Sequence, residues 1–123
     1  MTEPRMVDVT VIETRIVPVP EPDWCVDPHD VAHHFTDLTH FGRQTTVSVD
    51  TPVGAVDFLS ARISHAPYLE AQSEPYPVVG VALDLQADFQ AEDVAGLTRE
   101  LRAAADLLDE IAEQALRLRG GTE

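Results

Sequence analysis

Apolar and polar residues alternate along four separate stretches of the chain, which is the pattern of strands with one buried face. The first stretch places Val7, Val9 and Val11 on one side, and the last does the same with valine and leucine. All four stretches are rich in β-branched residues, which favour extended backbone. The pattern therefore predicts strands over residues 6–17, 45–49, 55–64 and 78–85.

The second and third predicted strands flank Asp50-Thr51-Pro52-Val53-Gly54, a turn sequence that contains proline and glycine. This arrangement predicts a β-hairpin with a longer loop. In the third strand the apolar alternation changes phase between Phe58 and Leu59. Either a β-bulge or burial on both faces would explain the change.

Residues 91–119 have the apolar spacing of three and four that is typical of an amphipathic helix. Gln90 occupies the capping position, acidic residues lie in the first turn, and Gly120-Gly121 ends the helix. Its spacing fits a coiled-coil seam as well as a helix packed on a sheet. Ala105, Leu107 and Ala112 widen the apolar stripe beyond a narrow seam, which favours packing on a sheet. A homodimer through leftover apolar surface on this C-terminal helix remains an alternative.

These elements predict an α+β fold, with a mainly antiparallel sheet of three or four strands covered by one long C-terminal helix. Residues 1–20 form an N-terminal strand and a proline-rich lead-in, residues 21–119 a single domain, and residues 120–123 a flexible end. Asp27 as N-cap and Pro28 at the first helical position predict a short helix from Pro28 to Phe35 or Leu38.

The chain is unusually acidic for its 123 residues. It has 22 acidic against 8 basic side chains, a formal net charge of −14. This charge disfavours binding to nucleic acid and leaves a basic protein partner, mimicry of nucleic acid, or plain solubility. Mimicry needs carboxylates clustered on one face, and they are spread along the chain instead.

The number of cysteines and the hydropathy of the chain indicate where in the cell the protein is located. The single cysteine excludes an internal disulfide. No apolar run approaches the ~20 residues of a membrane span, and no signal peptide opens the sequence. We therefore expect a cytoplasmic protein that does not insert into a membrane.

Candidate metal ligands gather early in the domain. Cys25 precedes His29 and His33, which lie four residues apart and would share one face of the predicted short helix. Thiolate sulfur and imidazole nitrogen are common zinc ligands, usually in sets of four. The fourth ligand would be His40, His34 or Glu21.

Other interpretations of these residues are open. A lone cysteine is often a small buried apolar residue, or it acts as a catalytic thiol with a histidine as base. His29-Asp30-Val31-Ala32-His33 differs by one residue from the H-E-x-x-H helix of zinc proteases. The aspartate is one methylene shorter than that glutamate, and the helix is short, so we interpret this match as chance.

Pro22-Asp23-Trp24-Cys25, His29, and His40-Phe41-Gly42 leading into a strand form one recurring pattern. It resembles a group of small actinobacterial proteins of unknown function, which share C-P-x-W-C, a histidine shortly after it, and a later histidine before the first strand of a sheet. The resemblance implies a two-cysteine, two-histidine zinc site with Cys25, His29 and His40 as three ligands. The first cysteine of that pattern falls at Glu21. Glu21 replaces it as a ligand, His33 takes its place, or the site has been lost.

We predict a non-enzymatic protein-interaction or regulatory module with a structural zinc ion. The alternative is a small metal-dependent hydrolase in which Cys25, His29 and His33 leave one coordination position for water. Such an enzyme needs a general base, and Asp30 and Glu21 are the nearby candidates.

Overall fold

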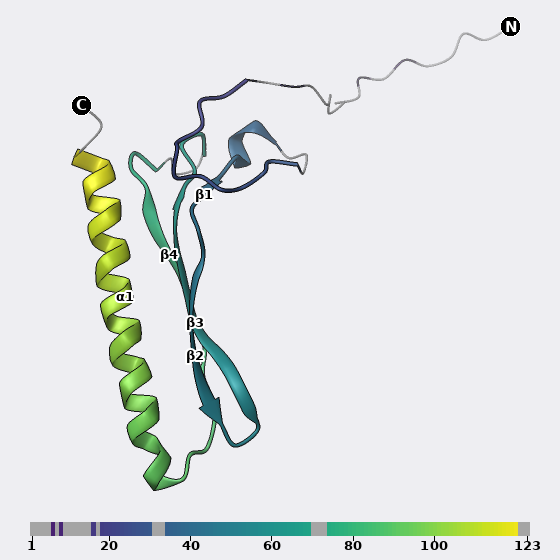
Figure 1. Ribbon diagram of the computed structural model, residues 1–123. Helices are drawn as coiled ribbons and strands as arrows, with labels where there is room; N and C mark the ends of the chain where they lie inside the picture. Colours follow the sequence, from purple (N-terminus) through teal and green to yellow (C-terminus); the bar gives the residue numbers. More distant parts are fainter. Residues whose placement is uncertain are drawn as a thin grey trace, which may run out of the picture.

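A long helix, α1 (Val94–Gly120), packs along one face of a four-stranded antiparallel sheet in the computed structural model (Figure 1). The structure describes residues 6, 8, 16, 18–30, 34–69 and 74–120. The predicted α+β class is confirmed. The strands are β1 (His40–Phe41), β2 (Thr45–Thr51), β3 (Gly54–His65) and β4 (Val78–Leu83), and two short 3₁₀ turns are η1 (Phe35–Asp37) and η2 (Ala91–Asp93).

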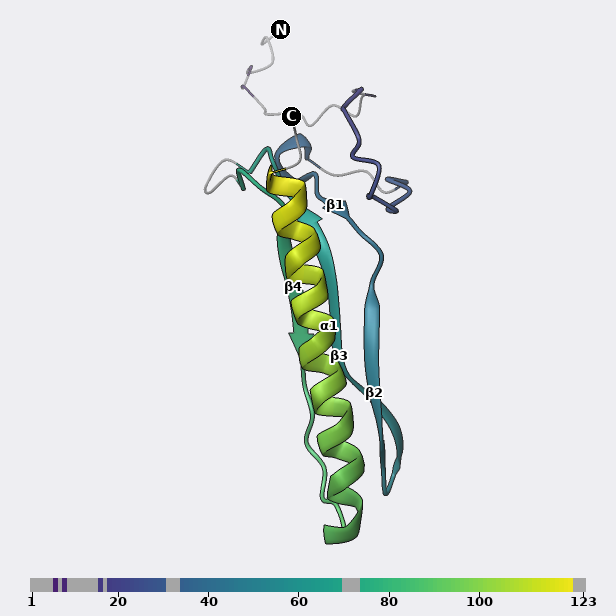
Figure 2. The same ribbon diagram turned by 60° about the vertical axis from the view of Figure 1, so that its left-hand side comes forward.

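β3 is the central strand of the sheet. β4 pairs with residues 59–64 of β3, and β2 pairs with residues 54–61. Ser64 faces Phe41 of β1 and Val78 of β4 at the same time. Hence β1 and β4 lie on opposite edges, and β1 and β2 follow one another along the same edge of β3. Figure 2 shows β4 and β2 on either side of β3, behind α1.

The β2–β3 hairpin is tighter than predicted. Its strands extend to Thr51 and Gly54, so Pro52 and Val53 alone form the turn. The Thr51 hydroxyl donates to the Gly54 carbonyl at 2.8 Å and accepts the Val53 N–H at 3.2 Å. Gly54 has φ of 121°, a conformation in which a Cβ atom would be strained. The prediction of a longer loop was wrong because this side-chain and glycine geometry closes the chain in two residues.

A β-bulge explains the change of phase in β3. Val47 pairs with Leu59 and Ser48 pairs with Asp57, so Phe58 has no partner in β2. Phe58 and Leu59 are both buried in the same apolar cluster. The extra residue therefore lets two consecutive side chains enter the core, and the predicted bulge is confirmed.

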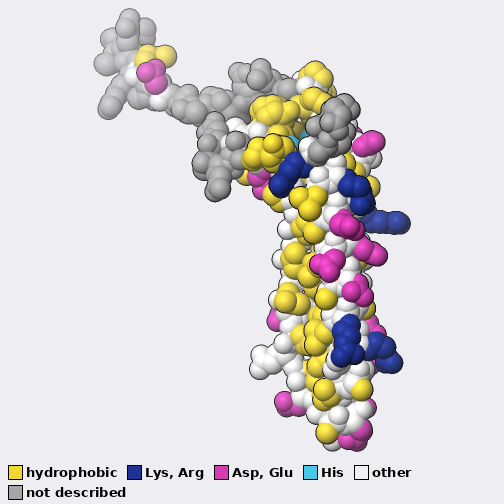
Figure 3. Space-filling model, turned by 90° about the vertical axis from the view of Figure 1, so that its left-hand side faces the viewer, with side chains coloured by type: hydrophobic (Ala, Val, Ile, Leu, Met, Phe, Trp, Pro, Cys, Tyr) yellow, Lys and Arg dark blue, Asp and Glu magenta, His cyan; other side chains and the backbone are white. Residues whose placement is uncertain are grey.

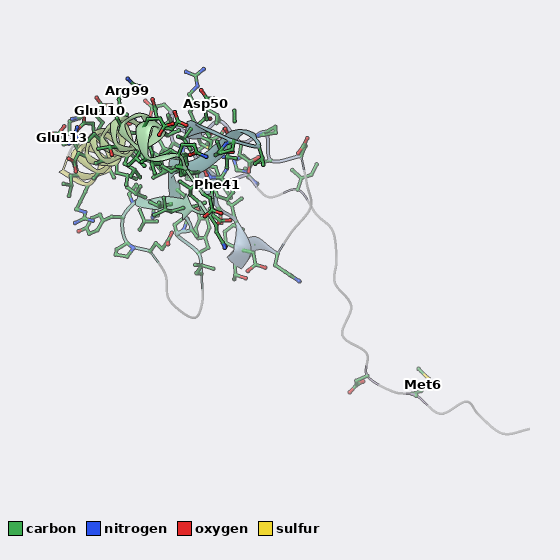
Figure 4. All side chains as sticks on the ribbon, turned by 90° about the horizontal axis from the view of Figure 1, so that it is seen from below. Met6, Phe41, Asp50, Arg99, Glu110 and Glu113 are labelled. Atoms are coloured by element: carbon green, nitrogen blue, oxygen red, sulfur yellow. The ribbon has the colours of Figure 1, made fainter. Side chains whose placement is uncertain are left out.

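The core lies between α1 and the face of the sheet that carries the apolar alternation. On the helix, Ala104, Ile111 and Ala115 are buried, and small alanines bring the helix close to the sheet. Glu110 and Glu113 project from the side of α1 that is turned away from the sheet (Figure 4). The sheet side of the core consists of Val49, Phe58, Leu59, Ala61 and Ile63.

Several predicted boundaries differ from the structure. β4 ends at Leu83, two residues before the predicted end, although the Asp84 N–H still donates to the Phe58 carbonyl at 2.9 Å. α1 continues through Gly120, and residues 91–93, predicted as its first turn, form the separate 3₁₀ turn η2. The strand predicted over residues 6–17 lies outside the described residues, apart from three isolated positions that belong to no strand.

The helix predicted to start at Pro28 does not start there. Pro28, His29 and Asp30 are not helical, and His29 has φ of 53°, which no right-handed helix contains. Residues 31–33 lie outside the described part of the chain. The nearest helical turn is η1, which spans three residues.

Candidate metal centre

The segment that carries Cys25 is fastened to the outer edge of β1. Its chain turns at Pro22–Cys25, where the Cys25 N–H donates to the Pro22 carbonyl at 3.1 Å. The next amide, that of Val26, donates to the Phe41 carbonyl at 2.8 Å. Both contacts hold Cys25 beside the β1 strand, at the end of the sheet where α1 finishes (Figure 1).

Trp24 and Gly42 fit together beneath this segment. A Cβ atom on Gly42 would lie 3.5 Å from Cε3 of Trp24 and 3.3 Å from the Ile63 carbonyl oxygen. The absence of a side chain at Gly42 therefore lets the indole approach the strand closely. Trp24 packs against the apolar core.

The conformation of His29 is set by Asp27. The His29 N–H donates to Oδ1 of Asp27 at 3.3 Å, which closes an Asx-type turn over Pro28. His29 is the one described non-glycine residue with positive φ. Such a conformation costs on the order of 1 kcal/mol and is common at ligand-binding positions. The turn takes the place of the predicted helix and directs the imidazole back toward Cys25.

Four side chains converge at this point: Glu21, Cys25, His29 and His40. One potential ligand atom from each lies within 4.8 Å of all the others. Nε2 of His29 is 3.0 Å from Oε1 of Glu21 and 3.5 Å from Sγ of Cys25. The imidazole rings of His29 and His40 lie edge to face with centroids 5.4 Å apart. This group could hold a metal ion.

The spacing agrees with a tetrahedral zinc or similar ion. Ligand atoms about 2.0–2.3 Å from such an ion lie roughly 3.3–3.6 Å from one another. The 3.5 Å between Cys25 and His29 lies in this range, the 3.0 Å between Glu21 and His29 is slightly below it, and the longest separation in the group would contract by roughly an ångström.

His40 is the most deeply buried member of the group, with 2% of its surface exposed. Within the described part of the chain, Nδ1 of His40 and Nδ1 of His29 are buried without a hydrogen-bond partner. Burial, together with the neighbouring His29, lowers the pKa of His40. The ring is therefore neutral at pH 7, which is the form that binds metals.

Burial also raises the pKa of the Cys25 thiol, and the Glu21 carboxylate adds to the effect. A thiol in this environment keeps its proton at neutral pH and is a poor nucleophile. Cys25 therefore lacks the reactive thiolate that a catalytic thiol requires. A metal cation is the kind of neighbour that would stabilise the thiolate.

The structure brings together four of the six residues named from sequence. Glu21 joins Cys25, His29 and His40, although the sequence ranked it below His33. His33 lies outside the described residues. His34 is exposed ahead of η1 and is not a member of the group.

Asp27 also lies close to the imidazole ring of His29, a contact that was not predicted from the sequence. Its Oδ2 lies 3.6 Å from Nδ1 of His29, on the side of the ring opposite Cys25 and Glu21. A carboxylate behind a metal-binding histidine orients the ring and strengthens the ligand. Asp27 stands two residues before His29 in the sequence, but it was interpreted only as a helix cap.

The fold and this group define a small α+β domain with a candidate four-ligand metal centre. Residues 6–117 match the family model described as a domain of unknown function, DUF6907, and the chain belongs to this family. No curated protein and no solved structure matches the chain. Within the described residues, no helix has both the length and the hydrophobicity to cross a membrane.

Proposed function

We propose that this protein is a non-enzymatic interaction module whose N-terminal segment is fixed to the sheet by a structural zinc ion. Cys25, His29, His40 and Glu21 hold the ion, and the module works in the cytoplasm. The observation that carries the proposal is the convergence of four ligand atoms within 4.8 Å, from residues up to nineteen positions apart in sequence.

A complete set of protein ligands supports a structural role. Structural zinc sites have four protein ligands, whereas catalytic sites have three and keep one position for water. Here the Glu21 carboxylate lies beside the Cys25–His29 pair, so the group offers four protein ligands. The alternative hydrolase was built on Cys25, His29 and His33, and His33 lies outside the described residues.

The cavities described in the structure also favour a non-enzymatic role. A cavity of about 390 Å³ lies between the β2–β3 turn and the start of α1, and none of its lining residues belongs to the metal group. A smaller one, about 180 Å³, lies along the middle of the sheet. A substrate bound in either would not touch the proposed ion.

The acidic surface supports a protein partner with basic side chains rather than nucleic acid. A net charge of −14 attracts cationic surfaces and repels phosphate. Acidic side chains are exposed along α1, among them Asp106, Asp109, Glu110 and Glu113.

Metal analysis of the full-length protein tests the proposal. We expect about one zinc ion per chain after purification without chelator. Cobalt replacing zinc should give the strong visible bands of a tetrahedral site with a sulfur–metal charge-transfer band. Cys25→Ala should abolish that charge-transfer band and lower thermal stability.

His34→Ala is the matched control, because this exposed histidine lies near the group without belonging to it. It should leave metal content and the cobalt spectrum unchanged. Metal-free protein with an unaltered melting temperature after zinc addition would refute the structural-zinc proposal. Zinc-dependent ester or phosphoester hydrolysis, lost in Cys25→Ala, would replace it with the hydrolase.

A further inference from the structure

β4 is an edge strand with no residue that discourages pairing. Natural edge strands usually carry charges, proline or a bulge, which prevent another strand from adding to them. The six residues of β4, Val78–Leu83, include none of these, and among the described residues only β3 pairs with this strand.

The free backbone groups of β4 belong to the residues that also carry its apolar side chains. The Asp84 N–H donates to the Phe58 carbonyl of β3, and bonding groups alternate in direction along an antiparallel strand. The N–H and C=O groups of Val79, Val81 and Leu83 therefore point to the free edge. Val81 and Leu83 are 51% and 67% exposed, which is unusual for strand residues of this type.

The helix extends this apolar surface. Arg119 lies over the ring of Tyr76, just before β4, with its guanidinium carbon 4.7 Å from the ring centroid. This contact shows which flank of α1 faces β4. Ala112, Ala105 and Leu101 lie on the same flank, in successive steps of seven, seven and four residues back from Arg119.

Figure 3 shows hydrophobic side chains in a column along one flank of α1, with acidic and basic side chains on the other. We call the combination of β4 and this flank the β4–α1 surface. Leu101 and Leu116 are 46% and 57% exposed on its helix side. From Val94 to Leu116 the flank is uncharged, with residues Val94, Thr98, Leu101, Ala105, Leu108, Ala112 and Leu116.

The charge pattern indicates which kind of molecule binds the β4–α1 surface. A basic partner is attracted by carboxylates, and the β4–α1 surface has none at the positions named above, although the chain carries 22 acidic residues. An identical surface matches it, because an uncharged patch is where two chains of net charge −14 can approach most closely. An unpaired strand also matches a copy of itself in antiparallel orientation.

We infer that two copies of this protein associate through the β4–α1 surface, with β4 pairing antiparallel to β4 of the partner. The two sheets then form one eight-stranded sheet, and the α1 helices lie on the same face of it. This interface is separate from the metal group and does not depend on metal binding.

Sedimentation or light scattering of the full-length protein at about 100 µM tests the inference, because association follows mass action. We expect a mass near twice the 13.5 kDa of one chain. Val81→Lys and Leu83→Lys should each shift the equilibrium toward monomer by at least about tenfold in Kd, since a charge must then be buried. Thr46→Lys, an exposed change on the opposite edge strand, should leave the dimer intact.

Val81→Pro isolates the contribution of the backbone. It removes an N–H that points to the free edge and leaves the bonds to β3 in place. We expect a folded monomer, verified by an unchanged circular dichroism spectrum. A monomeric wild type, or dimers of equal strength in Val81→Lys and Thr46→Lys, would overturn the inference.

Amide hydrogen exchange provides a test that needs no variant. The amides of Val79, Val81 and Leu83 should be protected at about 100 µM and exchange rapidly at about 1 µM, because only the dimer pairs them. Exchange that is independent of concentration at these three amides would equally refute pairing through β4.

Discussion

Glu21 is the residue on which the chemistry of the site depends. A carboxylate oxygen is a harder and weaker zinc ligand than a thiolate. The 3.0 Å separation from Nε2 of His29 places it within the group. In the proposed zinc site Glu21 is therefore the weakest of the four ligands.

Substitutions at Glu21 should raise or lower the affinity for zinc, depending on the residue introduced. Glu21→Cys supplies a second thiolate and should tighten zinc binding about tenfold or more, equal to at least about 1.4 kcal/mol. Glu21→Gln keeps the shape but removes the charge, and it should weaken binding. Competition against a chromophoric zinc chelator measures both. Equal affinities in wild type and Glu21→Gln would show that Glu21 is not a ligand.

Proton release on metal binding should come from Cys25. Burial raises the pKa of this thiol, so it is protonated at neutral pH and must lose its proton to bind zinc. His40 has a lowered pKa and is already neutral. We expect Cys25 to release about one proton between pH 7 and 8, with affinity rising about tenfold per pH unit. Calorimetry in buffers of different ionisation enthalpy measures the release, and Cys25→Ser should abolish it.

The lowered pKa of His40 also determines how the stability of the metal-free protein changes with pH. Its pKa in the fold lies below the usual value near 6.5, so the unfolded chain binds more protons in this range. The stability that a neutral His40 contributes is present above pH 6.5 and is lost as pH falls through the lowered value.

The sequence identified most of the candidate ligands but for a partly wrong geometric reason. His29 and His33 were grouped by their spacing on a predicted helix that Cys25 precedes, whereas an Asx-type turn and a left-handed His29 bring Cys25 and His29 together. Composition and spacing reveal which residues have the right chemistry. They do not reveal a positive φ at a histidine, because the surrounding contacts impose it.

At the scale of elements, α1 carries the strongest periodic signal and the largest share of the helix–sheet core. Ile111 is buried near its middle, between Ala104 and Ala115 on the same face. Ile111 is therefore the largest of the buried side chains that α1 contributes to the core. Its loss would leave a void that flanking alanines cannot fill.

Ile111→Ala should therefore lower the free energy of unfolding by about 2–5 kcal/mol. Chemical denaturation at fixed zinc and protein concentration measures the change. Gln114→Ala, an exposed substitution one turn further on, is the matched control and should shift stability by less than about 0.5 kcal/mol. Similar effects from both variants would mean that α1 does not pack on the sheet through this face.

Periodicity predicted β2, β3, β4 and the long helix, because each rests on the regular spacing of apolar residues, and it offered the bulge at Phe58 as one of two explanations. It did not predict β1, which has only two residues. The hairpin turn was predicted too long, since Pro52 and Gly54 mark a turn without fixing its length. There the decisive interactions are the two hydrogen bonds of the Thr51 hydroxyl. Local hydrogen bonds of this kind leave little trace in an apolar pattern.

At the scale of the whole molecule, charge and apolar surface are separated. The metal group lies at one end of the sheet, the carboxylates are exposed along the outer side of α1, and the uncharged β4–α1 surface runs along the edge (Figures 1 and 3). The net charge of −14 makes two chains repel at long range, and the β4–α1 surface adds no charge to that repulsion. It also makes two kinds of association distinguishable by ionic strength.

Added salt should strengthen self-association and weaken the binding of a basic partner. Each chain has a formal charge of −14, so two chains repel at long range while their meeting surfaces are uncharged. The screening length falls from about 30 Å at 0.01 M salt to about 3 Å at 1 M, which removes that repulsion and leaves apolar burial intact. Sedimentation equilibrium across this range should therefore show the dimer Kd falling as salt rises. A Kd that rises with salt would mean that ion pairs, and not the β4–α1 surface, hold the two chains together.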